Sequence, residues 1–509
     1  MRMPQWFSRA IAYEIYPQSF LDTNGDGIGD LRGVMDKLDY VRSLGCDTIW
    51  LNPCFDSPMQ DAGYDVRDYR KVAPRYGTNE DLEELFRQAH ARGMHILLDL
   101  VPGHTSDQHP WFRQSQEAER NEYSDRYIWT GNAFDKPREY NWICGTTQRN
   151  GCALINFFDM QPALNYGFGQ VSQPWQMDWR DPRCQATMEE IIDVMRFWLR
   201  KGCDGFRVDM ADSLVKDDPG KEATSALWRK AQAMLAKEFP QAVLVAEWSD
   251  PEKSLCKAQF QGDFYLNHEG PRGSGYRTLM RDGARSYFHK EARGDLNRFL
   301  NEYVHRYLLS RESGFICLIT SNHDTRRPAL ELDVSELKMA YSLLFTLPGV
   351  PFVYAGDEIG MRHLFLPSKE GGYDRTGDRT PLQWDHTPQY GFSTCPDTYL
   401  PQDMASDAPT VADQEAEEGS LLRYVRALLT FRRNTPELQA DAPFEAVWMG
   451  QDGYPFVYRR GGLMLALNAA ADAREIPFPV GDPLFLVGKV SPTDTGARLD
   501  GQSFVIWRA

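Results

Sequence analysis

The stretch CDGFRVDM, residues 203–210, decides the fold because the chain repeats its design: a short apolar run that ends in polar or charged residues. Such runs are typical of strands buried on both faces, as in a parallel sheet. Seven more segments follow this pattern, namely AIAYEIYPQSF at 10–20, CDTIWLNP at 46–53, HILLDLVPGH at 95–104, AVLVAEW at 242–248, DFYLNHE at 263–269, FICLITSNHD at 315–324 and VPFVYAGDE at 350–358. Together the eight runs predict a sheet of eight strands.

Amphipathic segments separate these runs, with apolar residues near three- and four-residue spacing. They include LRGVMDKLDYVRSLG at 31–45, NEDLEELFRQAHARG at 79–93, ATMEEIIDVMRFWLRKG at 186–202, ATSALWRKAQAMLAKEF at 223–239 and LKMAYSLLFTLPG at 337–349. This spacing indicates helices. Strands that alternate with helices form parallel βαβ units, so the sequence predicts an α/β fold, a closed (β/α)8 barrel.

Two segments depart from this alternation. The segment after the third strand, residues 103–177, is rich in Trp, Tyr, Asn and Gly, and a structureless loop of that length is uncommon in a compact domain. From residue 444 onward, short alternating runs are broken by Gly, Pro and Asp, which predicts an all-β domain. We therefore predict four parts: barrel at 1–102, inserted B domain at 103–177, barrel at 178–435, and a β-sandwich-like C-terminal domain at 436–509.

The composition excludes several classes of protein. The chain has 509 residues, 56 Lys and Arg against 72 Asp and Glu, and a net charge of −16, so a nucleic-acid partner is not expected. The most apolar stretch, Leu343–Ala355, is too short to cross a bilayer, so no membrane partner is expected either. The N-terminal residues lack the features of a secretory signal, and we expect a cytoplasmic location.

The nine cysteines give no sign of a metal site or a disulfide framework. They are scattered singly, without a CxxC pair and without a histidine at metal-ligand spacing. The sequence therefore predicts reduced thiols, most of them packed as small hydrophobic side chains.

Three acidic residues follow predicted strands at the end where barrels carry their catalytic groups: Asp209, Glu247 and Asp324. Three carboxylates at one barrel mouth are costly to bury unless they are paired or used chemically. Glycoside hydrolysis needs this equipment, because one carboxylate attacks the anomeric carbon and a carboxylic acid protonates the leaving oxygen. Arg207 is expected to lower the pKa of Asp209, whereas Glu247 lies in an apolar run and is expected to stay protonated.

The motifs around these residues resemble the α-amylase superfamily, glycoside hydrolase family 13. DLVPGHT at 99–105, GFRVDMAD at 205–212, VAEW at 245–248 and SNHD at 321–324 are similar to its four signature regions. YEIYPQSF at 13–20, DTNGDGIGD at 22–30, GYDVRDY at 63–69, QPALN at 161–165 and GDRTPLQW at 377–384 extend the resemblance over the chain. Several of these resemble in particular the oligo-1,6-glucosidase, α-glucosidase and trehalose synthase branch.

The resemblance implies a role for each matching residue. Asp209 is implied as the nucleophile, Glu247 as the general acid/base and Asp324 as the stabiliser of the transition state. The residues implied in sugar binding are Asp61, Tyr64, His104, Phe157, Gln161, Arg207, Met210, His323 and Arg379. Among them, Asp61 and Arg379 match a pair that clamps the non-reducing glucose in α-glucosidases.

Three positions depart from the family pattern. Gly103 stands where the family has Asn, and Ala163 stands where it has an acid in the QPDLN element. Met210 follows the nucleophile, where relatives carry the Thr or Val that helps separate α-1,4 from α-1,6 preference. The linkage preference is thus left open.

The loop DTNGDGIGD presents oxygen atoms at alternate positions, as the first part of an EF-hand does, although the bidentate Glu is absent. Relatives bind calcium or magnesium in this loop. The resemblance implies a structural Ca²⁺ site, with Mg²⁺ as the alternative ion, held by Asp22, Asn24, Asp26, Ile28 and Asp30. An Asx-turn without metal is the competing interpretation.

These observations predict a retaining, exo-acting α-glucosidase of short oligosaccharides, as a monomer or small homo-oligomer. One alternative is a transglycosylase or isomerase, trehalose-synthase-like or sucrose-acting, which shares the covalent intermediate but excludes water. The others are a non-catalytic relative, such as the heavy chains of amino-acid transporters, and a carbohydrate-binding protein. Intact Asp209, Glu247 and Asp324 argue against both non-enzymes.

Overall fold

A computed structural model describes residues 3–509 except 146, 266–275, 281–285, 292–293 and 371–374. All eight predicted strands occur and close into a parallel barrel in the order β1-β12-β11-β10-β9-β8-β5-β2. The barrel strands are β1 (Ala12–Ile15), β2 (Thr48–Leu51), β5 (His95–Leu100), β8 (Gly205–Val208), β9 (Val243–Ala246), β10 (Gly262–Phe264), β11 (Phe315–Ile319) and β12 (Val350–Tyr354). The predicted (β/α)8 barrel is confirmed; residues 266–269 of the sixth run lie outside the described residues.

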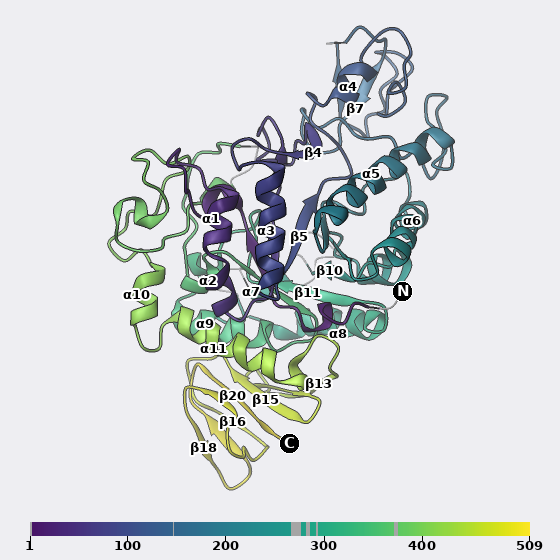
Figure 1. The fold of residues 1–509 in the computed structure, drawn as a ribbon. Coiled ribbons are helices and arrows are strands. Elements are labelled where there is room, and N and C mark those ends of the chain that lie inside the picture. Colours follow the sequence, from purple (N-terminus) through teal and green to yellow (C-terminus); the bar gives the residue numbers. More distant parts are fainter. Residues whose placement is uncertain (1–2, 146, 266–275, 281–285, 292–293, 371–374) are drawn as a thin grey trace.

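Helices surround the barrel in Figure 1, and the predicted amphipathic segments are among them. The described α-helices are α1 (Leu31–Asp36), α2 (Leu38–Ser43), α3 (Asn79–Ala91), α4 (Pro110–Ser115), α5 (Pro182–Lys201), α6 (Glu222–Glu238), α7 (Tyr276–Met280), α8 (Leu296–Ser310), α9 (Val334–Leu344), α10 (Val411–Ala416) and α11 (Leu421–Asn434). Local signals set their ends. A capping box between Thr78 and Asp81 starts α3, and Gly202, with φ of 117°, ends α5.

One predicted helix is divided in two. The segment 31–45 forms α1 and α2, which are separated at Lys37. The backbone of Lys37 has φ of −108° and ψ of 9°, and its N–H donates to the carbonyl of Val34 three residues earlier rather than four. This tighter turn breaks the helical ladder, a change that apolar spacing alone does not reveal.

The segment after β5 rises above the barrel in Figure 1 and contains α4 and a short hairpin of β6 (Trp142–Cys144) and β7 (Cys152–Leu154). The hairpin register places Cys144 opposite Cys152, and the two form a disulfide. The prediction of nine reduced thiols is therefore wrong at this pair, because the hairpin that brings the two together was not evident from their spacing. The cytoplasmic location stays a prediction.

The C-terminal part is all-β, as predicted, and forms two sheets of order β13-β14-β15-β20-β17 and β16-β19-β18. Their strands are β13 (Phe444–Met449), β14 (Phe456–Arg460), β15 (Leu463–Asn468), β16 (Arg474–Ile476), β17 (Phe485–Val487), β18 (Val490–Pro492), β19 (Ala497–Leu499) and β20 (Ser503–Arg508). Arg460 reaches out of β14 and is fully buried. It donates hydrogen bonds to the carbonyls of Thr346, beyond the end of α9, and of Gln439, the latter at 2.6 Å.

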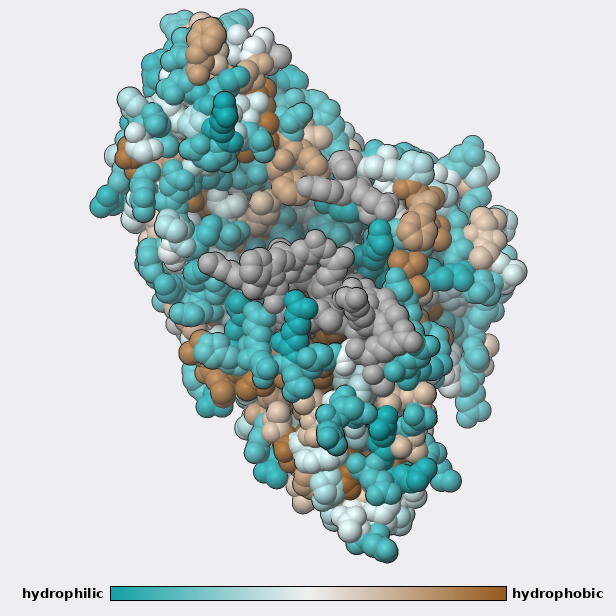
Figure 2. Space-filling view, turned by 180° about the vertical axis from the view of Figure 1, so that it is seen from behind, coloured by the Kyte–Doolittle hydropathy of each residue, from teal (hydrophilic) through white to brown (hydrophobic). Residues whose placement is uncertain are grey.

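The surface carries no extended apolar face in the view from behind. Figure 2 shows a face covered mainly by hydrophilic residues, with hydrophobic ones in small separate groups. Within the described ranges, no helix has the length and apolarity needed to cross a membrane. The domain limits at 103, 178 and 436 stay predictions.

Candidate active site

The barrel strands bring the three predicted carboxylates to one cavity. Asp209 directly follows β8, Glu247 directly follows β9, and Asp324 lies in the turn after β11. The cavity has a volume of about 430 Å³ and is lined by Asp61, Tyr64, His104, Phe157, Asp209, Met210, Asp212, Glu247, Trp248, Asp324 and Arg375. It lies at the carboxyl ends of the strands, where barrel enzymes carry their catalytic groups.

Arg207 lies beneath this cavity and contacts three carboxylates at once. One terminal nitrogen, Nη1, lies 3.0 Å from Oδ1 of Asp209 and 2.9 Å from Oδ1 of Asp99. The other, Nη2, lies 2.7 Å from Oε2 of Glu247. The guanidinium is almost fully buried, so these short ion pairs are made in a poorly solvated environment. One cation thereby contacts both the Asp209 and the Glu247 carboxylate.

The pKa of Asp209 differs from our expectation. Burial raises it, and although Arg207 lowers it, the neighbouring carboxylates Glu247, Asp99 and Asp324 raise it further. The prediction that Arg207 holds this pKa low is therefore wrong for the free protein. The attraction is present, but one guanidinium shared among three carboxylates does not offset the cost of desolvation.

Asp324 is held ionised by cations from two segments. His323 Nε2 lies 3.0 Å from Oδ2 of Asp324, and Oδ1 accepts from Arg375 at 2.7 Å and from Arg379 at 2.8 Å. Burial by itself would raise the pKa of Asp324, but His323, Arg375 and Arg379 hold it well below its usual range. This carboxylate therefore stays negative beside Asp209 and Glu247.

His323 is held as a cation by two acidic residues. Its Nδ1 lies 2.7 Å from Oε1 of Glu14, a buried residue of β1, and its Nε2 faces Asp324 and the hydroxyl of Tyr64. The Tyr64 ring stacks on the imidazole with centroids 5.3 Å apart. Burial by itself would lower the pKa of His323, but Asp324 and Glu14 raise it to about 9.

Asp61 has a different partner from the one predicted. It accepts hydrogen bonds from Gln161 Nε2 at 2.7 Å and from Arg375 Nη2 at 2.8 Å. Arg379 instead donates to the carbonyl of His323 at 2.8 Å and to Asp324. The predicted ion pair between Asp61 and Arg379 is therefore corrected: Arg375, four residues earlier, bridges Asp61 and Asp324, because contacts at His323 and Asp324 already engage the guanidinium of Arg379.

The departure at Gly103 is compensated by another residue. A side chain at Gly103 would meet Asn156 Nδ2 at 2.7 Å, so the missing Asn leaves the space that Asn156 fills. Asn156 Nδ2 lies 3.1 Å from Nδ1 of His104, and Asn156 accepts from Lys216 Nζ at 2.8 Å. Burial lowers the pKa of His104 to about 3, so this imidazole is neutral at pH 7.

The outer part of the cavity is more apolar. Phe157, with 40% of its surface exposed, lies on the rim, and Trp248 and Met210 complete the wall. Met210 has a positive φ of 40°, a backbone conformation that residues other than glycine seldom adopt. Its N–H donates to Oε2 of Glu247 at 3.0 Å. The backbone after Asp209 is thus tied to Glu247.

Four residues that build the site were not among the predicted ones, namely Glu14, Asn156, Trp248 and Arg375. Glu14 lies in the middle of an apolar strand, and an acid in that context was the available signal. Trp248 follows Glu247 directly. Asn156 lies in the inserted segment 103–177 and Arg375 lies in the long stretch between β12 and α10, and the sequence did not predict the fold of either.

In the predicted metal loop, side-chain oxygens accept hydrogen bonds from the loop's own backbone N–H groups. Asp22 accepts from the N–H groups of Asn24, Gly25 and Gly27, while Asn24 and Asp26 each accept from the N–H two residues on. Asp30 accepts from Thr23 and caps α1. No three His, Cys, Asp or Glu side chains within the described part of the chain converge as metal ligands. The Ca²⁺ site, including the carbonyl of Ile28, stays a prediction.

Metal binding at this loop would stabilise the folded protein by mass action. We expect added Ca²⁺ to raise the melting temperature, and a chelator to lower it, by several degrees. The Asp26→Asn variant, which weakens the donor set, should lose this response. A melting temperature that neither Ca²⁺, Mg²⁺ nor chelator changes in the parent protein would leave the loop as a set of Asx-turns.

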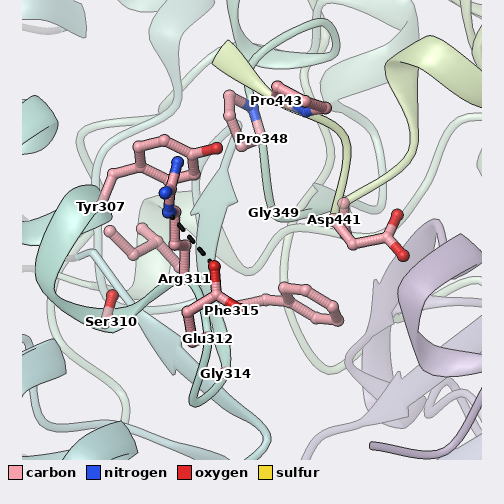
Figure 3. Close-up of a pocket in the computed structure, with 12 residues that line it drawn as sticks. Tyr307, Ser310, Arg311, Glu312, Gly314, Phe315, Pro348, Gly349, Asp441 and Pro443 are labelled. Carbon is pink, nitrogen blue, oxygen red and sulfur yellow. Dashed lines mark ion pairs between the residues drawn. The ribbon is translucent and has the colours of Figure 1, made fainter. Parts of the chain in front are cut away.

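Figure 3 shows another cavity, of about 330 Å³, at the opposite end of the barrel. It lies beside Phe315, the first residue of β11, and Pro348 before β12, with Asp441 on its far side and the ion pair of Arg311 and Glu312 at its edge. None of the predicted site residues lines it. We therefore place the active site in the cavity of the three carboxylates.

Comparison with known proteins agrees with this geometry. Residues 14–441 match the family model described as alpha amylase, catalytic domain. The chain is 30% identical to an oligo-1,6-glucosidase of Heyndrickxia coagulans, covering 97% of both chains, and 32% identical to a trehalose synthase/amylase of Mycobacterium tuberculosis, covering 86% of this chain and 77% of the relative. The solved structure of an alpha-glucosyl transfer enzyme, XgtA, superposes with a TM-score of 0.80 at 26% identity over 99% of both chains. The chain thus belongs to the α-amylase family, glycoside hydrolase family 13, and is a glycoside hydrolase.

Proposed function

We propose that the protein is a retaining, exo-acting α-glucosidase that hydrolyses short α-linked oligosaccharides. The observation that carries the proposal is the placement of Asp209 and Glu247 on the two ends of one guanidinium, that of Arg207. A pair of carboxyl groups at one sugar-sized cavity supplies the nucleophile and the acid of a double displacement.

In the proposed reaction, Asp209 attacks the anomeric carbon while Glu247 protonates the departing glycosidic oxygen. Oε2 of Glu247 forms an ion pair with Arg207 and accepts a hydrogen bond from the Met210 N–H, so Oε1 is the oxygen left to carry that proton. Water, deprotonated by Glu247, then attacks the glucosyl–Asp209 ester and releases glucose with retained configuration. Asp324 supplies negative charge near the oxocarbenium-like transition state.

The exo mode is supported by the far wall of the cavity. Asp61, Gln161 and Arg375 are joined by hydrogen bonds, and both Asp61 and Gln161 are buried. A wall of polar groups at this end would bind the hydroxyls of one non-reducing glucose and block a longer chain. Phe157, Met210 and Trp248 are then the contacts available to the leaving sugar.

A transglycosylase or isomerase is the second candidate, favoured by the names of the trehalose synthase/amylase and glucosyl-transfer relatives. Both activities pass through the same glucosyl–enzyme ester and differ in the acceptor. We therefore expect a panel of maltose, isomaltose, sucrose, trehalose and starch, with products identified by chromatography, to give mainly glucose from the short substrates. Trehalose from maltose, or isomaltulose from sucrose, would favour the second candidate. Rapid internal depolymerisation of starch would exclude the exo mode.

The pH dependence of kcat/KM should reflect the ionisation of Asp209 and of His323. Asp209 must be ionised to attack, and because burial raises its pKa, activity should fall on the acid side at a pH higher than the usual range of Asp. The pKa of His323 is raised to about 9, so the charge that it contributes beside Asp324 is present at pH 7 and lost as the pH rises through about 9. Constant kcat/KM across both of these ranges would contradict the assignment.

A further inference from the structure

A buried carboxylate that the proposed reaction does not use holds the loop after the proposed acid. Asp263 lies in β10, beside Ala246 of β9, and no part of it is exposed to solvent. Its two oxygens accept from three consecutive N–H groups, those of Trp248 and Ser249 at 3.1 Å each and of Asp250 at 3.0 Å.

This arrangement suits a carboxylate, because each of its two oxygens can accept from more than one donor. The fourth hydrogen bond to Asp263 comes from the hydroxyl of Ser254 at 2.7 Å, so all four of these partners are donors. Burial raises the pKa of Asp263 to about 7, and the four hydrogen bonds oppose a further rise. An amide or an apolar side chain of the same shape would leave some of these donors without an acceptor.

The loop that Asp263 holds is strained and leads directly from Glu247. Ser249 has a positive φ of 58°, a conformation that costs free energy in a residue other than glycine. On the other side, the Glu247 N–H donates to the carbonyl of Val208 at 3.0 Å, at the end of β8. Glu247 is thus fixed between a strand bond and a loop whose shape depends on Asp263.

We propose that Asp263 is the positioning residue for the general acid/base, Glu247, and for the wall residue Trp248. It touches no substrate. It fixes the backbone from which both side chains project, and it thereby sets how well Glu247 reaches the leaving oxygen. This inference rests on the proposed function, in which Glu247 protonates the leaving group.

The test compares two substrates that differ in their need for an acid. Maltose requires protonation of its leaving oxygen, whereas α-glucosyl fluoride releases fluoride with little assistance, and kcat/KM for both reports formation of the glucosyl–enzyme ester. In Asp263→Asn we expect kcat/KM to fall about 10- to 100-fold for maltose and less than about threefold for the fluoride. Equal losses for both substrates would overturn the positioning role.

A matched control is Asp65→Asn. Asp65 is a second fully buried carboxylate, which accepts from the N–H groups of Gln60 and Asp61 at 3.0 Å each and from the Ser57 hydroxyl at 2.9 Å. It holds the loop of Asp61, at the glucose shared by both substrates, so this variant should lower both kcat/KM values by the same factor.

A variant that does not fold and a failure of the proposed function must both be distinguished from a failure of the inference on Asp263. If Asp263→Asn does not fold, Ser254→Ala removes one of the four donors, and an unchanged ratio of the two kcat/KM values in that variant would overturn the proposal. If the parent protein cleaves neither maltose nor the fluoride, the proposed function fails. If it cleaves both and the two variants behave alike, only the inference on Asp263 fails.

Discussion

Asp209→Asn is expected to lower kcat/KM by about 10³-fold or more, because the amide cannot form the covalent glucosyl–enzyme ester on which both steps depend. The effect should lie in the chemical step and not in folding, since Asn keeps the shape of Asp. A rapid-quench search for the labelled ester, with a slow activated substrate, should find it on Asp209 in the parent protein and not in the variant.

The surface variant Asp39→Asn, made and assayed in the same way, is the control, because that carboxylate is largely exposed and pairs with Arg92. It should retain parental activity. Near-parental activity of a correctly folded Asp209→Asn protein would remove Asp209 from the role of nucleophile.

Arg207→Leu is expected to destabilise the fold by about 3 to 5 kcal/mol at pH 7 and to abolish activity, because it leaves three carboxylates without their shared cation. Arg207 lowers the pKa values of Asp99 and Asp209, so without it both should rise above those in the parent protein. The folded state then binds more protons than the unfolded state, so the loss of stability should shrink as the pH falls toward about 5. Urea unfolding at several pH values measures this.

Arg207→Lys is the companion variant, since it keeps one positive charge but cannot contact several carboxylates in the same geometry. It should recover part of the stability and little of the activity. A deficit of Arg207→Leu that does not vary with pH would contradict this account of the site.

The barrel could be predicted from the sequence because each strand is a short apolar run and each helix carries apolar residues at three- and four-residue spacing. The structure of the inserted segments was harder to predict, because their shape depends on contacts between residues far apart in the sequence. The disulfide of Cys144 and Cys152 needs a hairpin that only the tertiary structure defines. Arg375 was missed for a similar reason: Arg379 matched the family pair, and only the three-dimensional arrangement shows which guanidinium meets Asp61.

The prediction that Arg207 lowers the pKa of Asp209 below its usual value was wrong for a different reason. Sequence proximity correctly predicted that Arg207 contacts Asp209, but the sign of a pKa shift is a balance between attraction and desolvation. That balance depends on how many carboxylates share the cation and on how deeply they are buried. Neither quantity can be read from a motif.

The reach of Arg460 into the barrel has a consequence for how the chain can be divided. Its guanidinium extends out of the C-terminal sheet and donates to the carbonyl groups of Thr346 and Gln439, both of which precede β13, the first strand of that sheet along the chain. Cutting the chain before β13 would remove this donor from both carbonyls and would expose the buried guanidinium on the isolated sheet to solvent. The C-terminal sheet and the barrel are therefore joined by a buried side chain. A C-terminal sheet taken from a relative would fit this barrel only if it carried an arginine at the position of Arg460.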